Sequence, residues 1–177
     1  MLDIAILTHC ATDRVNYTQL CSLLEARQWQ DADLETRSLM LQIVGLPESS
    51  YLVEAVLREF PHESLHAIDR LWRKFSSDRF GFSIQHRIWQ QIGGSHADAN
   101  YDTWLDFGQS VGWRQGFWLT DAQLTYDLSA PTGHLPALWA EELELGDIAV
   151  SLFDRLSDSS DVCRSIDENR GTIPKPG

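Results

Sequence analysis

The hydrophobic residues of this chain recur mostly at intervals of three and four, the spacing of helices that bury one face. Seven stretches show this pattern, at residues 16–25, 29–43, 51–59, 61–75, 83–92, 101–111 and 138–156. The chain shows no internal repeat and no alternation of the kind that marks strands. The pattern predicts an all-α domain of about seven short helices around one core.

Local sequence signals indicate where several of these helices begin and end. Asn16 followed by Gln19 is typical of a capping box, and Ser83 is expected to cap the helix that follows it. Pro47 closes the second helix, and Pro61 suits the first turn of the next long one.

The helical pattern fails between Gly112 and Pro136, a stretch rich in glycine, proline and aromatic residues. An irregular segment of this length inside a small domain is more often functional than filler. The resulting division of the chain is an N-terminal arm at 1–13, a helical domain at 14–156 and a flexible polar tail at 157–177.

The net charge argues against several kinds of partner. The 177 residues suit one domain with tails, and 26 acidic against 14 basic residues give a formal charge of −12. Such a field repels phosphate backbones and anionic lipid surfaces, which disfavours nucleic-acid binding. The richest basic stretch, Arg70–Arg87, also contains acidic and aromatic residues, and we interpret it as the solvated side of helices.

Cysteine usage and the first residues indicate a cellular compartment. Cys10, Cys21 and Cys163 form neither a disulfide framework nor a metal-ligand pair, which is typical of a reducing environment. The apolar run at residues 4–7 is too short for a secretory signal or a membrane span. We therefore expect a cytoplasmic bacterial protein.

Residues 62–66 read His-Glu-Ser-Leu-His, which matches the helix motif of zinc peptidases. That chemistry needs both histidines on one helix face, a third ligand and the glutamate as general base. The downstream glycine and histidine of the extended motif are missing, and Pro61 places His62 in a fraying first turn. We expect two solvent-facing histidines and no bound metal, and keep a zinc hydrolase through His62, Glu63 and His66 as a remote alternative.

Other catalytic arrangements are weakly represented. Ser83, Ser129 and His134 do not lie in a nucleophile elbow, and Gly93–Gly94 is a helix stop rather than a phosphate-binding loop. No acid–base pair can be placed from the sequence. We therefore expect a binding protein and not an enzyme.

The irregular segment offers groups that suit a flat apolar ligand with acidic substituents. Its apolar side chains can form a wall, and the Arg114 guanidinium can donate hydrogen bonds to a carboxylate. The candidate wall residues are Phe117, Trp118, Leu119, Leu124 and Tyr126. The alternative is that they only pack the segment onto the helices, and the residues alone favour neither reading.

Three motifs occur in a fixed order. Residues 79–89 read Arg-Phe-Gly-Phe-Ser-Ile-Gln-His-Arg-Ile-Trp, residues 111–114 read Val-Gly-Trp-Arg, and residues 127–136 read Asp-Leu-Ser-Ala-Pro-Thr-Gly-His-Leu-Pro. Together they resemble the genomes-uncoupled-four family, and the resemblance runs from about Tyr17 to Trp139. It also includes shorter matches at Ala32–Thr36, Phe60–Pro61 and Ile68–Trp72.

The resemblance implies a function. Members of this family are helical domains that bind protoporphyrin or its magnesium form reversibly in a cupped site, with no covalent cofactor. They stimulate magnesium chelatase, through its large porphyrin-binding subunit, in chlorophyll synthesis. The expected setting is the cytoplasm of a cyanobacterium-like cell. By the family's pattern, the cup is walled here by Val53, Leu57, Phe117, Trp118 and Leu124.

Two features depart from the family's pattern. Glu141 and Glu142 follow the Gly-His-Leu-Pro motif where some chelatase-activating relatives have a basic residue, so Glu142 at the rim would repel a porphyrin propionate. A short arm stands where some relatives carry a helical domain. The alternative function is therefore a bilin-sensing or protein-interaction module on the same scaffold, without chelatase activation.

Overall fold

The computed structural model describes residues 15–95, 101–137 and 149–157. Within these residues the prediction of an all-α fold is confirmed, with seven α-helices, one 3-10 helix and no strand. The last helix is described at 149–157, and its predicted first part, 138–148, lies outside the described residues. The labelled elements are α1 (Thr18–Glu25), α2 (Trp29–Ile43), α3 (Glu54–Arg58), α4 (His62–Ser76), α5 (Phe82–Gln91), α6 (Tyr101–Val111) and the 3-10 helix η2 (Asp121–Gln123).

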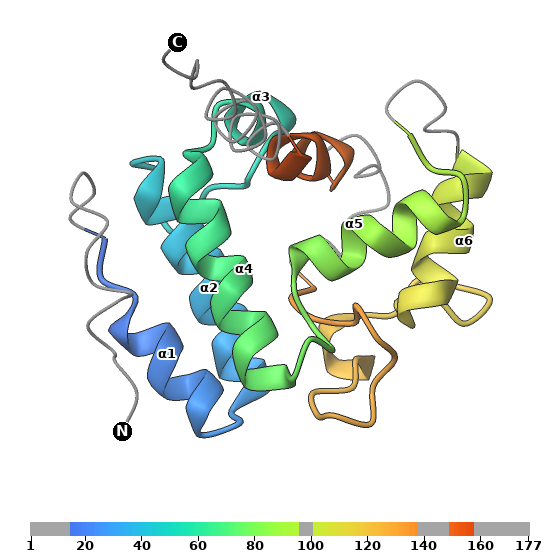
Figure 1. Ribbon diagram of the computed structural model, residues 1–177, viewed down its shortest axis with the longest axis horizontal. Helices are drawn as coiled ribbons and strands as arrows, with labels where there is room; N and C mark the ends of the chain where they lie inside the picture. Colours follow the sequence, from blue (N-terminus) through green and yellow to red (C-terminus); the bar gives the residue numbers. More distant parts are fainter. Residues whose placement is uncertain (1–14, 96–100, 138–148, 158–177) are drawn as a thin grey trace, which may run out of the picture.

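The helices pack in two groups, which lie side by side in Figure 1. In one group α1 packs against both α2 and α4, and in the other α5 packs against α6. The helical residues 149–157 connect the groups, since Phe153 contacts Phe107 of α6. Arg155 reaches the other group and donates a hydrogen bond to the carbonyl of Phe60, 2.8 Å away.

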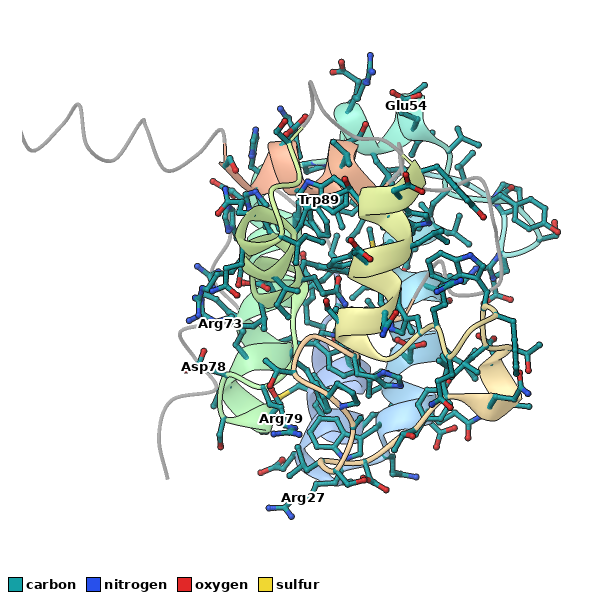
Figure 2. The ribbon with its side chains drawn as sticks, turned by 90° about the vertical axis from the view of Figure 1, so that its right-hand side faces the viewer. Arg27, Glu54, Arg73, Asp78, Arg79 and Trp89 are labelled. Carbon is teal, nitrogen blue, oxygen red and sulfur yellow. The ribbon has the colours of Figure 1, made fainter. Side chains whose placement is uncertain are left out.

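Large aromatic side chains fill the core of both groups. Trp29 and Trp72 stack with their ring centroids 6.0 Å apart, and Trp89 meets Phe107 edge-on at 5.8 Å. Figure 2 shows Trp89 between α5 and α6. Every tryptophan that the structure describes is buried, except Trp118, which is partly exposed. The tryptophans are thus mainly core residues.

The two predicted N-caps are wrong. Tyr17, not Asn16, occupies the N-cap position of α1. The Asn16 side chain closes a turn instead, because its oxygen accepts a hydrogen bond from the backbone N–H of Thr18 at 3.0 Å. Gly81 is the N-cap of α5, so Ser83 lies inside the first turn and caps nothing.

The two longest helices agree closely with the hydrophobic pattern. α2 and α4 each contain 15 residues. Pro61 occupies the N-cap position of α4, one residue before its expected place. None of the helices in the described part of the chain is long and apolar enough to cross a membrane.

Candidate functional site

His134 lies at the point where two of the sequence motifs meet. Its imidazole is 1% exposed. The Nδ1 atom is 2.7 Å from the carbonyl oxygen of Val111 at the end of α6, and Nε2 accepts a hydrogen bond from the backbone N–H of Thr125 at 3.1 Å. Since a carbonyl can only accept, Nδ1 carries the proton and the ring is neutral. Burial lowers the pKa of His134, while the hydrogen bond to the Val111 carbonyl raises it by less.

The third motif joins this network through Gln85 of α5 and Arg79 of the connection before α5. The Gln85 amide donates to the carbonyls of Gly133 at 3.0 Å and Pro136 at 2.8 Å. The Arg79 guanidinium donates to the carbonyl of Ala130 at 3.0 Å. These bonds bind residues 130–136 to α5, so the three motifs are above all the framework that holds the irregular segment against the helices.

Asp33 connects the end of the same segment to α2. Its carboxylate, which is buried, accepts a hydrogen bond from the backbone N–H of Ala137 at 2.7 Å. The pKa of Asp33 is raised to about 7, mainly by burial; the bond from Ala137 opposes this, and the nearby Asp121 carboxylate adds to it. Asp33 belongs to the Ala32–Thr36 match noted in the sequence, and the structure shows its role as an anchor.

Residues 113–118 form a tight hairpin that closes with one bridge between Arg114 and Trp118. The Arg114 guanidinium donates to the carbonyl of Gly116 at 3.0 Å. The Trp118 ring stacks on Trp104 of α6, with centroids 5.6 Å apart. Phe117, next to it in the sequence, is 61% exposed. The hairpin therefore has two aromatic side chains, Trp113 and Trp118, on the helices and one, Phe117, in water.

The structure separates the predicted ligand-binding residues into three groups. Val53 and Phe117 are exposed, whereas Leu57 and Leu124 are buried in the core. Arg114, Trp118 and Tyr126 are partly buried, and Glu142 lies outside the described residues. Contact of these residues with a ligand stays a prediction.

A second region was not predicted from the sequence. A cavity of about 580 Å³ opens beside α1, α2 and Glu48 of the following loop, a volume that suits a small ligand. Its lining comprises Gln19, Leu23, Asp31, Leu34, Glu35, Arg37, Ser38, Leu41 and Glu48, which includes none of the predicted ligand-binding residues. Burial raises the pKa of Glu35, and the Glu48 carboxylate adds to the effect. In the sequence, these positions are indistinguishable from the solvated face of a helix.

The zinc-peptidase motif forms the first turns of α4. His62 and His66 are partly buried rather than solvent-facing, which corrects the expectation from the sequence. Burial lowers the pKa of His66; the Asp69 carboxylate opposes this, and Arg70 and His62 add to it. Among the described residues, no three His, Cys, Asp or Glu side chains are grouped so that they could hold a metal ion.

The chain is similar to proteins of known sequence. A family model described as GUN4-like matches residues 11–145. The Ycf53-like protein of Synechocystis is 32% identical over 131 residues, which cover 70% of this chain and 52% of that protein. The chloroplastic tetrapyrrole-binding protein of Arabidopsis thaliana is 38% identical over 68 residues, 37% of this chain and 26% of that protein. The chain thus spans about half the length of the Synechocystis relative.

Two solved structures share the fold. The ligand-free structure of Arabidopsis thaliana GUN4 has a TM-score of 0.65 and 28% identity, and covers 77% of this chain and 93% of its own. The structure of GUN4 from Chlamydomonas reinhardtii has a TM-score of 0.67 and 25% identity, and covers 82% of this chain and 91% of its own. Because the family model matches most of the chain, the chain belongs to the GUN4-like family.

Proposed function

We propose that this chain is a non-catalytic regulator that binds a porphyrin reversibly and modulates porphyrin flux at magnesium chelatase. The family supports the proposal, as does the name of the Arabidopsis relative, a tetrapyrrole-binding protein. The partner in this proposal is the large porphyrin-binding subunit of the chelatase, and the setting is a cyanobacterium-like cytoplasm. The ligand is protoporphyrin, its magnesium form or a bilin.

The exposure of Phe117 is the observation that carries the proposal. Its ring is 61% exposed on a hairpin that Trp113 and Trp118 hold against α6. When a flat apolar ligand covers an exposed aromatic side chain, apolar surface leaves water, and this favours binding. A tetrapyrrole supplies such a face, with Phe117 and the exposed part of Trp118 as its contacts.

The other predicted residues take supporting roles in this proposal. Val53, which is 49% exposed at the start of α3, adds a second apolar contact. The Arg114 guanidinium exchanges its bond to the Gly116 carbonyl for a stronger one to a propionate. Tyr126 lines the edge of the site. The buried Leu57 and Leu124 support the wall from beneath. Glu142 lies outside the described residues, and its repulsion of a propionate stays an expectation from the sequence.

A protein-interaction module is the second candidate function. The cavity beside α1 and α2 favours it, because that cavity is lined by Asp31, Glu35 and Glu48 against one cation, Arg37. Such a lining repels a dicarboxylate porphyrin and suits a basic segment of a partner.

Two exposed aromatic residues provide a matched test. Phe117 and Tyr101 are both 61% exposed. We expect Phe117→Ala to weaken protoporphyrin binding by about 1–2 kcal/mol, the scale of one apolar contact, and Tyr101→Ala to leave it unchanged. Binding is followed by the shift of the porphyrin absorption band, and thermal melts confirm that both variants fold. Equal affinities for the two variants would place the ligand elsewhere.

A further inference from the structure

Within the irregular segment, His134 binds both ends of one loop. At one end the Trp113 indole donates a hydrogen bond to the His134 carbonyl oxygen at 2.7 Å. At the other end the Thr125 backbone N–H donates to Nε2 of the His134 ring at 3.1 Å. Residues 114–124, which include the exposed Phe117, therefore form a loop whose two ends meet at His134.

We propose that His134 is a positioning residue for ligand binding, and that its neutral imidazole holds the 114–124 loop in the conformation that binds a tetrapyrrole. The inference rests on the proposed function, since it assigns the ligand to this loop. His134 acts through Thr125 and does not itself reach the ligand, because its side chain is buried.

Protonation of the ring breaks one of the two closures. In the neutral ring Nδ1 donates to the Val111 carbonyl, and Nε2 is free to accept from Thr125. A second proton on Nε2 would point at the Thr125 N–H, so two donors would face each other. The Thr125 end of the loop then separates from His134, and affinity for the ligand falls in acid.

Few charged groups near the His134 ring could influence its protonation. α5 presents the neutral amide of Gln85, and α6 presents the Val111 carbonyl. The Arg79 guanidinium, from the connection before α5, is bound to the Ala130 carbonyl. The causes that shift the pKa of His134 are burial and the Val111 carbonyl. Burial dominates and lowers the pKa of His134, so the ring is neutral and the loop stays closed at neutral pH.

Two substitutions each retain one half of the ring's hydrogen bonding. In His134→Gln the amide oxygen can stand near the position of Nε2 and accept from Thr125, without titrating. In His134→Asn the amide nitrogen can stand near the position of Nδ1 and donate to Val111, but Thr125 loses its acceptor. Both variants alter the same buried site, and because asparagine is one methylene shorter than glutamine, thermal melts of both measure the packing that the shorter side chain loses.

The experiment measures protoporphyrin affinity of the full chain and both variants between pH 5 and pH 7.5. At pH 7.5 we expect His134→Asn to bind about fivefold to tenfold more weakly than wild type, the effect of one lost hydrogen bond, and His134→Gln to restore most of the affinity. Toward pH 5 the wild-type protein should weaken relative to His134→Gln. That ratio cancels the titration of the porphyrin itself.

Hydrogen exchange at the Thr125 amide gives a readout that needs no ligand. We expect the amide to be protected in wild type and His134→Gln, and to exchange fast in His134→Asn. If both variants lose affinity in proportion to their melting temperatures, with a constant wild-type to His134→Gln ratio across pH, the residue is merely structural and the inference is wrong. If wild-type protein binds no protoporphyrin, the proposed function fails, and exchange alone decides: equal Thr125 protection in all three proteins overturns the positioning role.

Discussion

The carboxylate of Asp69 on α4 lies 2.8 Å from the backbone nitrogen of Ser83, in the first turn of α5. It accepts a hydrogen bond from the first turn of α5, where the sequence predicted a local cap by the Ser83 side chain. The donor and acceptor are 14 residues apart in the sequence, so the start of α5 depends on the packing of α4. The Ile68–Trp72 match therefore includes a residue that links two helices.

The first prediction concerns this cap. We expect Asp69→Ala to lower the free energy of unfolding by about 2–3 kcal/mol, because a buried cap is lost and an N–H group is left unpaired. Asp78→Asn is the control, because asparagine tolerates the left-handed backbone of this position, where φ is 58°. The Asp78 carboxylate lies 2.7 Å from Arg73 in an exposed pair, visible in Figure 2, and its loss should cost less than about 0.5 kcal/mol. Urea unfolding measures both. Similar losses in the two variants would contradict the cap.

The second prediction compares two glycines. Gly81 and Gly116 have φ angles of 133° and 82°, a region that favours glycine. A Cβ atom at Gly81 would lie 2.8 Å from the Asp69 carboxylate oxygen, whereas one at Gly116 meets nothing within 4 Å. We expect Gly116→Ala to cost about 1 kcal/mol from backbone strain alone and Gly81→Ala about 3 kcal/mol or more. If thermal melts show that Gly116→Ala is less stable than Gly81→Ala, the contact between α4 and α5 has room for the added Cβ atom.

Features of the fold that arise from residues close together in the sequence were predicted, whereas features that depend on residues far apart were not. The apolar stripes of α2 and α4 arise from residues three and four apart, so their bounds were predicted within a few positions. The cap of α5 comes from another helix and was missed. The three sequence motifs predicted the family correctly. Their side chains, however, mostly hold the irregular segment against the helices. Burial of His134 and Gln85 follows from tertiary packing, which no local pattern reveals.

The candidate site was predicted less completely than the fold. Exposure of Phe117 and burial of Leu57 have no separate signal in the sequence, since both are apolar residues in plausible positions. The cavity lined by Asp31 and Glu35 was missed because acidic residues on a helix normally face solvent.

The third prediction concerns pH. The pKa of Asp33 is raised to about 7 in the folded protein from an ordinary value of 3.8. Between these values the folded state binds a proton that the unfolded state releases, so the stability contributed by Asp33 is complete below pH 4 and is lost as pH rises through 7. We expect Asp33→Asn, which keeps an acceptor for Ala137, to be more stable than wild type at pH 8 by about 1–3 kcal/mol.

At pH 4 the advantage of Asp33→Asn should vanish. Because the comparison is between two proteins at the same pH, contributions from other groups cancel. Urea unfolding at several pH values measures the difference, and an advantage that is constant from pH 4 to pH 8 would show that Asp33 does not titrate in this range.

The fourth prediction concerns Trp118, whose ring packs on Trp104 and over Gly108. The sequence left open whether Trp118 contacts a ligand or packs the segment onto the helices, and the structure places its ring against α6. We therefore expect Trp118→Ala to reduce both stability and affinity, by about 2–3 kcal/mol for unfolding and about 1–3 kcal/mol for protoporphyrin. Parallel melts and titrations measure the two effects. A loss of stability with unchanged protoporphyrin affinity would mean that Trp118 packs against the helices and does not contact the ligand.

The central claim is that the hairpin and the segment around it bind a tetrapyrrole. Titration of the purified chain with protoporphyrin, followed by tryptophan emission, tests it most directly, since Trp118, Trp113 and Trp104 lie within one aromatic cluster at the site. We predict saturable quenching at about one porphyrin per chain, with a shift of the pigment's main absorption band as it leaves water. Emission that falls only linearly with added pigment, with no saturation for protoporphyrin, its magnesium form or biliverdin, would contradict the account.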